Sequence, residues 1–252
     1  MLCAGISFKF GVEHWMLYGG YAFLATFVVY NGQRLLKSND ISKTPWLFWV
    51  NSNKRFITFL IFITGLMLAA IMVSIVNFKY NVYLLLVIGG LSSLLYVVRI
   101  GKRNAREIPY LKIHLISITW VLVLVLFPIV IEDVKVQWLW ISIAHYFYVL
   151  GVTIPFDIRD LKYDSPKHKT IPQTFGTIGA KRISVFALVL FYAMMILVYP
   201  DFLYNPFYHI GILVQIVLVL MMNEKRSDFY CAGLIDGAIA ILGISYFFLA
   251  AG

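Results

Sequence analysis

Three aspartates follow a long apolar segment at helical spacing. The stretch 155–176 reads PFDIRDLKYDSPKHKTIPQTFG and contains Asp157, Asp160 and Asp164. If the preceding helix continues at 100° per residue, the three carboxylates fall within an arc of about 60°. Carboxylate oxygens in such a cluster suit Mg²⁺, which typically binds one or two carboxylates together with phosphate oxygens of a substrate. The spacing therefore predicts a Mg²⁺ site formed by these three residues.

Ion pairing is the alternative interpretation of the same cluster. The cations Arg159, Lys162 and Lys169 lie in the same stretch and could neutralise the carboxylates without a metal. The metal interpretation is favoured because the aspartates follow an apolar segment directly, and ionisable groups at such places are costly and tend to be functional. The residues alone thus indicate a membrane enzyme that handles a phosphorylated lipid.

The elements that must position this cluster are membrane-spanning helices. Hydrophobic residues make up 61% of the chain and charged residues 13%, against roughly 45–50% and about 25% in soluble domains. A spanning helix needs about 20 apolar residues, and runs without polar alternation exclude lipid-facing barrel strands. The sequence therefore predicts an all-α polytopic membrane protein whose charged residues leave eight apolar segments: 14–33, 56–78, 80–98, 113–131, 136–156, 183–200, 202–223 and 229–252.

The basic residues orient these segments. Residues 34–55, 99–112, 157–182 and 224–228 together hold 18 of the 21 lysines and arginines. Because basic loops stay in the cytoplasm, we expect one domain, 1–252, in the plasma (inner) membrane with cytoplasmic loops 34–55, 99–112 and 157–182. Basic residues at span ends are explained by the anionic leaflet, so no nucleic-acid partner is expected. The apolar piece before Lys9 has only eight residues, which predicts a truncated first span.

DIRDLKYD followed by KTIPQTFG resembles the second aspartate-rich motif of the UbiA-type intramembrane prenyltransferases, in which DxRDxxxD precedes a short loop and (K/R)TxP. That family has nine spans and two aspartate-rich cytoplasmic loops. The resemblance implies a nine-helix bundle with the first helix truncated. It also implies Mg²⁺-dependent transfer of an isoprenoid chain from a prenyl diphosphate to a hydrophobic or aromatic acceptor, with the catalytic, metal-binding residues Asp157, Asp160 and Asp164.

The first motif departs from the family pattern, which resembles NDxxDxxxD. The corresponding residues 31–39 read NGQRLLKSN, so Asn31 is kept while Gly32, Leu35 and Asn39 replace the aspartates. The first metal site should therefore be weak or absent. Arg34 lies beside these positions, and an arginine can contact phosphate at two points. We expect Asn31 and Arg34 to bind diphosphate; the alternative for Arg34 is a simple anchor at the membrane surface.

Further polar residues are assigned through the same resemblance. The loop 96–112, YVVRIGKRNAREIPYLK, resembles the family's tyrosine-plus-basic segment that faces the diphosphate. It supplies the remaining diphosphate-binding candidates together with the (K/R)TxP lysine: Tyr96, Arg99, Lys102, Lys112 and Lys169. Asp236 lies inside the last apolar segment, where a carboxylate is costly unless it faces the bundle. We expect it in a polar cavity, with Lys112, His114 or a tyrosine as its partner, and we expect His114 and His145 in the core or the cavity.

Two other functions remain open. A non-catalytic UbiA-like protein that binds an isoprenoid or a quinone is supported by the lost aspartates of the first motif. A transporter would place its polar site near mid-membrane, whereas the ionisable residues here gather at one end of the apolar segments. The sequence indicates no obligate protein partner besides the bilayer itself.

Overall fold

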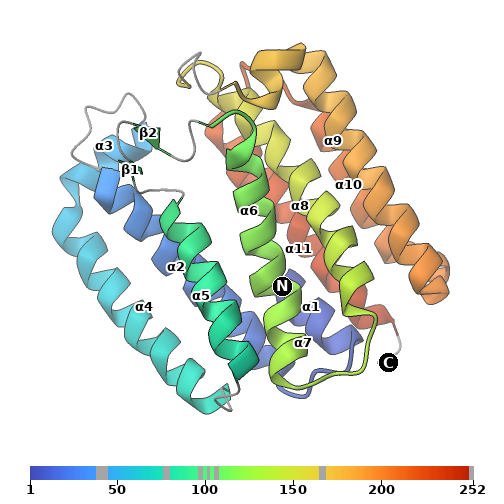
Figure 1. Ribbon diagram of the computed structural model, residues 1–252. Helices are drawn as coiled ribbons and strands as arrows, with labels where there is room; N and C mark the ends of the chain where they lie inside the picture. Colours follow the sequence, from blue (N-terminus) through green and yellow to red (C-terminus); the bar gives the residue numbers. More distant parts are fainter. Residues whose placement is uncertain are drawn as a thin grey trace.

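The computed structural model describes residues 1–37, 45–75, 80–95, 99–100, 103–104, 108–164 and 169–249, and these form a bundle of helices (Figure 1). The first half is α1 (Leu2–Lys9), α2 (Trp15–Lys37), α3 (Pro45–Ser52), α4 (Lys54–Ile75) and α5 (Tyr80–Leu95). Two short strands follow, β1 (Arg99–Ile100) and β2 (Arg103–Asn104), and they pair antiparallel.

The second half contains the longer helices. One continuous helical segment comprises α6 (Leu111–Val121), the π-helical stretch η2 (Leu122–Leu126) and α7 (Phe127–Ile131). It is followed by α8 (Trp138–Asp160), α9 (Ile171–Val198), the 3-10 turn η4 (Pro200–Tyr204) and α10 (Pro206–Met221). The last segment combines the π-helical η5 (Tyr230–Ile235), α11 (Asp236–Ser245) and the 3-10 turn η6 (Tyr246–Phe248).

The expected membrane character is confirmed. Within the described residues, five helices are long and apolar enough to cross a membrane: Lys54–Ile75, Leu111–Ile131, Trp138–Asp160, Ile171–Val198 and Tyr230–Phe248. Shorter apolar helices cover Val82–Ser92 and Pro206–Met221, in two further segments where spans are expected. Helix α4 is almost entirely unburied within the chain and presents large apolar side chains such as Phe56, Phe59 and Phe62. A bilayer is the solvent that suits such a surface.

Small residues let the central helices approach closely. A Cβ atom at Gly151 of α8 would lie 2.9 Å from Leu188 of α9, and Ser184 donates a hydrogen bond of 2.6 Å to the Gly151 carbonyl. On the other side of the bundle, a Cβ at Gly5 of α1 would overlap the Gly243 carbonyl of α11. Such small-residue contacts are typical of helices that pack in membranes. They fix α8 against α9 and α1 against α11.

The helices extend beyond the apolar segments into the charged stretches. Helix α8 continues to Asp160, and α9 begins at Ile171, twelve residues before the apolar segment 183–200. The expected loop 157–182 is thus largely helical, because charged residues on a helix end do not break the backbone hydrogen bonds. The start of α6, the end of α8 and the start of α9 lie together at the upper end of the bundle in Figure 1.

Candidate functional site

Two of the three motif aspartates contact one lysine. Lys112 is the second residue of α6, and its Nζ lies 2.6 Å from Asp157 Oδ1 and 3.7 Å from Asp164 Oδ2. Asp157 is in the last turn of α8 and is only 2% exposed. The backbone N–H of Asp164 donates to the Asp160 carbonyl at 2.8 Å, so the chain turns helically beyond the end of α8. Packing of α6 against α8 therefore brings Lys112, Asp157 and Asp164 together.

The third aspartate has a different partner. Arg159 Nε donates to Asp160 Oδ1 at 2.7 Å and lies 3.6 Å from Asp228 Oδ1. The Arg159 guanidinium also lies over the Phe156 ring, 5.4 Å from its centroid, within the distance of about 6 Å at which a cation is attracted to an aromatic face. Asp160 and Asp228 therefore share one arginine, just as Asp157 and Asp164 share one lysine.

The donor set fits Mg²⁺ in part. Asp157 and Asp164 direct oxygens at one point that holds a positive charge, and two carboxylates with substrate phosphate oxygens are a common Mg²⁺ set. Asp160 points to Arg159, and among the described residues no three histidine, cysteine or acidic side chains are grouped closely enough to hold a metal. The aspartates of the structure are therefore ion-paired. Arg159 is one of the three cations that the sequence predicted as partners, whereas Lys112, and not Lys162 or Lys169, is the other cation in these pairs.

Arg34 of α2 lies near the same end of the bundle. Its guanidinium stacks over the Tyr30 ring at 5.1 Å. Burial lowers the pKa of Arg34 from its ordinary value, and the positive charge of Arg159 contributes in the same direction. Asn31 donates its side-chain N–H to the Phe27 carbonyl at 2.8 Å, within its own helix. The first-motif segment thus carries a half-buried arginine stacked on a tyrosine of its own helix.

The structure describes only part of the expected diphosphate-binding set. Tyr96 and Lys102 lie outside the described residues, and Arg99 is described only as part of the β1 backbone. Lys169 is exposed immediately before α9 and has a positive φ of 43°. Among the members whose side chains the structure describes, Lys112 contacts the aspartates.

Asp236 begins α11 and its side chain is exposed within the chain. It makes no hydrogen bond or ion pair with any part of the protein that the structure describes. Two of its three expected partners are engaged elsewhere: Lys112 with Asp157, and His114 with the Tyr146 hydroxyl at 2.5 Å. His145 is fully buried, as expected for a core histidine.

Asp228 and Tyr146 were missed by the sequence analysis. Asp228 ends a short charged stretch, residues 223–228, and its link to Arg159 joins positions 69 residues apart in the sequence. Tyr146 is one of 16 tyrosines, and nothing in its neighbours distinguishes it from packing residues. The one available signal for Asp228 was its place in a loop of only a few residues between two apolar segments, and Glu224 shares that place.

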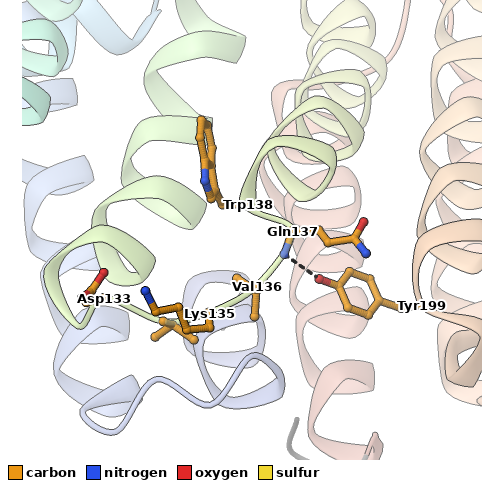
Figure 2. A pocket seen from close by; sticks show the side chains of 7 residues that line it. Asp133, Lys135, Val136, Gln137, Trp138 and Tyr199 are labelled. Atoms are coloured by element: carbon orange, nitrogen blue, oxygen red, sulfur yellow. Dashed lines mark hydrogen bonds between the residues drawn. The ribbon is translucent and has the colours of Figure 1, made fainter.

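A surface hollow lies at the opposite end of the bundle (Figure 2), lined by residues 133–138 and Tyr199. Its wall is tied by a hydrogen bond of 3.3 Å from the Gln137 N–H to the Tyr199 hydroxyl. Lys135 is the only cation and Asp133 the only carboxylate among its lining residues. The hollow is therefore separate from the aspartate cluster, and it lacks a comparable concentration of charge.

The fold and the cluster together define a helical, multi-pass membrane protein with a charged site at one end of its bundle. No family model, no curated protein and no solved structure matches the chain.

Proposed function

We propose that the protein is a UbiA-type prenyltransferase that moves an isoprenoid chain from a prenyl diphosphate to a hydrophobic or aromatic acceptor within the membrane. The supporting helix order is α1, α2, α4, α5, α6–α7, α8, α9, α10 and η5–η6. These are nine positions among the described residues when the short α3 between α2 and α4 is left out, and the first of them has eight residues. This order is the one that the family resemblance implies. The protein is then a plasma (inner) membrane enzyme whose aspartate cluster faces the cytoplasm.

The observation that carries the proposal is the convergence of Asp157 and Asp164 on one cation at a nearly buried helix end. A buried carboxylate is stable only with a compensating charge. Lys112 supplies that charge when no metal ion is bound. A Mg²⁺ ion bound to Asp157 and Asp164 would replace it and leave the ammonium available to a diphosphate oxygen.

Each residue then has a stated role. Bound Mg²⁺ would supply positive charge to the diphosphate as the carbon–oxygen bond breaks. Asp157 and Asp164 would hold that ion, and Asp160 would join them by leaving Arg159. Lys112, Arg34 and Arg159 would neutralise the leaving diphosphate, which takes the bonding electron pair, an electrostatic form of catalysis. The acceptor carbon forms the new bond to the allylic carbon and loses a proton.

A non-catalytic lipid-binding protein is the second candidate. The observation that favours it is the 2.6 Å bond from Lys112 to Asp157, which satisfies the carboxylate without a metal. The first motif adds no aspartate to compensate, since Gly32 and Leu35 occupy those positions. Such a protein would bind an isoprenoid or quinone chain without breaking a diphosphate bond.

Turnover separates the two candidates. Purified protein in lipid nanodiscs would receive prenyl diphosphates of several lengths, a set of aromatic acceptors, and either Mg²⁺ or EDTA. The enzyme releases diphosphate and forms prenylated acceptor only with Mg²⁺, whereas the lipid-binding protein retains the unchanged diphosphate. The variant Asp160→Asn should abolish release.

The matched control is Asp201→Asn. Asp201 pairs with Lys9 at 2.8 Å in η4, which begins after the far end of α9, so it is a salt-bridged aspartate remote from the cluster. Release should be unaffected in this control. Equal loss in both variants would indicate damage to the fold, and Mg²⁺-independent release that survives Asp160→Asn would overturn the proposed enzyme.

A further inference from the structure

A closed set of aromatic rings lies between α8, α9, α10 and η6, away from the aspartate cluster. Tyr148 and His145 of α8 lie 4.9 Å and 5.2 Å from the Phe191 ring of α9. Phe202 of η4 lies 4.8 Å from Tyr208 and 5.2 Å from Tyr246. All six rings are at most 1% exposed, so neither lipid nor bulk water reaches them.

Only some of the polar atoms in this ring cluster have hydrogen-bond partners in the described part of the protein. His145 uses both nitrogens, one with the Ile141 carbonyl at 2.7 Å and one with the Tyr246 hydroxyl at 2.9 Å. The hydroxyls of Tyr148 and Tyr208 have no hydrogen-bond partner within the described part of the chain. Two fully buried hydroxyls of the cluster thus have no partner among the residues that the structure describes.

Gln215 presents the same feature deeper in the bundle. It lies on the buried face of α10 with Tyr208, two helical turns or about 10 Å further along. Its side chain is 1% exposed, and neither Oε1 nor Nε2 finds a hydrogen-bond partner among the residues described. Gly211, between the two positions, packs against the Leu242 backbone, which closes α10 onto α11.

Unsatisfied groups of this kind are unfavourable in any protein interior. Nearly all buried polar side chains have a partner in protein or in ordered water, and burying an amide or hydroxyl without one is costly. A primary amide offers two donors and one acceptor, and each hydroxyl offers one donor as well as acceptor capacity. A group that satisfies these atoms must therefore both donate and accept hydrogen bonds. Because the enclosing residues are at most 1% exposed, it must also be small.

We propose that the interior between α8, α9, α10 and α11 binds ordered water at two places, one at the Tyr148 and Tyr208 hydroxyls and one at the Gln215 amide. Water both donates and accepts, and buried waters typically make about three hydrogen bonds to such groups. The first water site belongs to the same buried ring cluster as the His145–Tyr246 hydrogen bond. The proposal is independent of any prenyl transfer at the aspartate cluster.

X-ray radiolytic labelling tests the first site. The method generates hydroxyl radicals from bound water as well as from bulk solvent, so a buried ring that touches ordered water is oxidised despite its burial. We expect oxidation of Tyr148 and Tyr208 at least about tenfold faster than that of Phe202, which is equally buried but has no polar atom to hold water. Equal, negligible labelling of all three residues would overturn the first site.

Thermal unfolding of Gln215 variants tests the second site. If water satisfies the amide, Gln215→Leu removes favourable hydrogen bonds and leaves the water unsupported, so the midpoint falls. If the amide is dry, the same substitution removes an unsatisfied group and the midpoint rises. Ile212→Leu, an apolar exchange on the same buried face of α10, is the control for repacking. A midpoint for Gln215→Leu above that of wild type would overturn the second site.

Discussion

At the scale of single residues, the candidate site is a set of carboxylates paired with cations, and one of these carboxylates, Asp157, is buried. Asp157 is 2% exposed and accepts a 2.6 Å bond from Lys112, so its charge depends on that ammonium or on a substitute. Removing one partner of a buried pair leaves an uncompensated charge, whereas removing both does not. For the same reason, Lys112 is needed for stability when no metal is bound. A metal ion bound to Asp157 and Asp164 would free the Lys112 ammonium from this pair.

Lys112→Met should destabilise the protein by roughly 3 kcal/mol, because it leaves Asp157 charged and buried. Adding Asp157→Asn to this variant should restore most of the loss, since the uncompensated charge is then removed. Thermal unfolding in detergent compares the stability of wild type, Lys112→Met and the double variant. The measurement is repeated at two Mg²⁺ concentrations that differ about tenfold and are on the order of millimolar. The exposed Lys225→Met is the control. Similar unfolding temperatures for Lys112→Met and Lys225→Met would show that the pair contributes nothing.

Arg34→Ala should weaken prenyl diphosphate binding about tenfold or more, because a charge-assisted two-point contact is lost. Arg34→Lys should restore only part of the affinity, since an ammonium cannot reproduce the planar guanidinium. Titration of a non-hydrolysable prenyl diphosphate against the three proteins measures this. Indistinguishable affinities would assign Arg34 to membrane anchoring and to its stack on Tyr30.

At the scale of elements, the KTIP sequence of the family resemblance coincides with a helix start. Thr170 is the N-cap of α9, Pro172 follows at the second helical position, and Gln173 accepts a 3.0 Å bond from the Thr170 N–H. Proline in the first turn suits a helix start because its missing N–H has no intrahelical partner there. The threonine and the proline therefore have a structural role, whatever lipid the site binds.

Gly176→Ala should destabilise the protein by about 1–3 kcal/mol, because Gly176 kinks α9 with φ 70° and ψ 171°, a region that only glycine adopts readily. Nothing within 4 Å would meet the added methyl group, so the effect would be conformational. Thermal unfolding of Gly237→Ala provides the matched comparison, since Gly237 is also open to a methyl group but lies in regular helix. Gly237→Ala should be neutral or stabilising. A neutral Gly176→Ala would contradict the kink.

Helical periodicity predicted which aspartates share a face but could not predict what meets that face. Asp157 and Asp164 converge on one cation, as their spacing indicates, yet Lys112 lies 45 residues from Asp157 in the sequence. That contact depends on how α6 packs against α8, which periodicity within one segment does not encode. Helix ends were likewise displaced, because α8 and α9 continue through charged residues that mark the edges of apolar segments. The apolar segments themselves are direct consequences of composition and were predictable.

At the scale of the whole molecule, charge is distributed between the two ends of the bundle. The end with the aspartate cluster carries Lys112, Arg159 and Arg34, while the far end is joined by compact contacts such as Lys9 with Asp201. At that far end Glu132 also accepts hydrogen bonds from the His14 backbone and ring nitrogens, at 3.1 Å and 2.9 Å. Both ends therefore have ion pairs that join separate elements, and the end with the aspartate cluster is the one where we propose that diphosphate binds.

The positive-inside rule predicts that the cluster end lies in the cytoplasm, and cysteine labelling of intact cells can check this. Ser52→Cys, at the exposed end of α3, should resist a membrane-impermeant maleimide until the cells are opened. Lys135→Cys, in the α7–α8 link, should react from outside. The native Cys3 and Cys231 are 2% and 0% exposed and give little background. Labelling of Ser52→Cys from outside would contradict the predicted orientation and place the cluster end on the outer face.

The most direct test of the central claim is the Mg²⁺ dependence of diphosphate binding at the end of α8. A non-hydrolysable prenyl diphosphate would be titrated into wild type, Asp157→Asn, Asp164→Asn and the remote control Asp201→Asn, with Mg²⁺ and with EDTA. If the aspartates hold the ion that binds diphosphate, wild type and Asp201→Asn bind at least about tenfold more tightly with Mg²⁺, and the two cluster variants lose that gain. Binding that is equally tight in EDTA and unchanged in Asp157→Asn and Asp164→Asn would contradict the account.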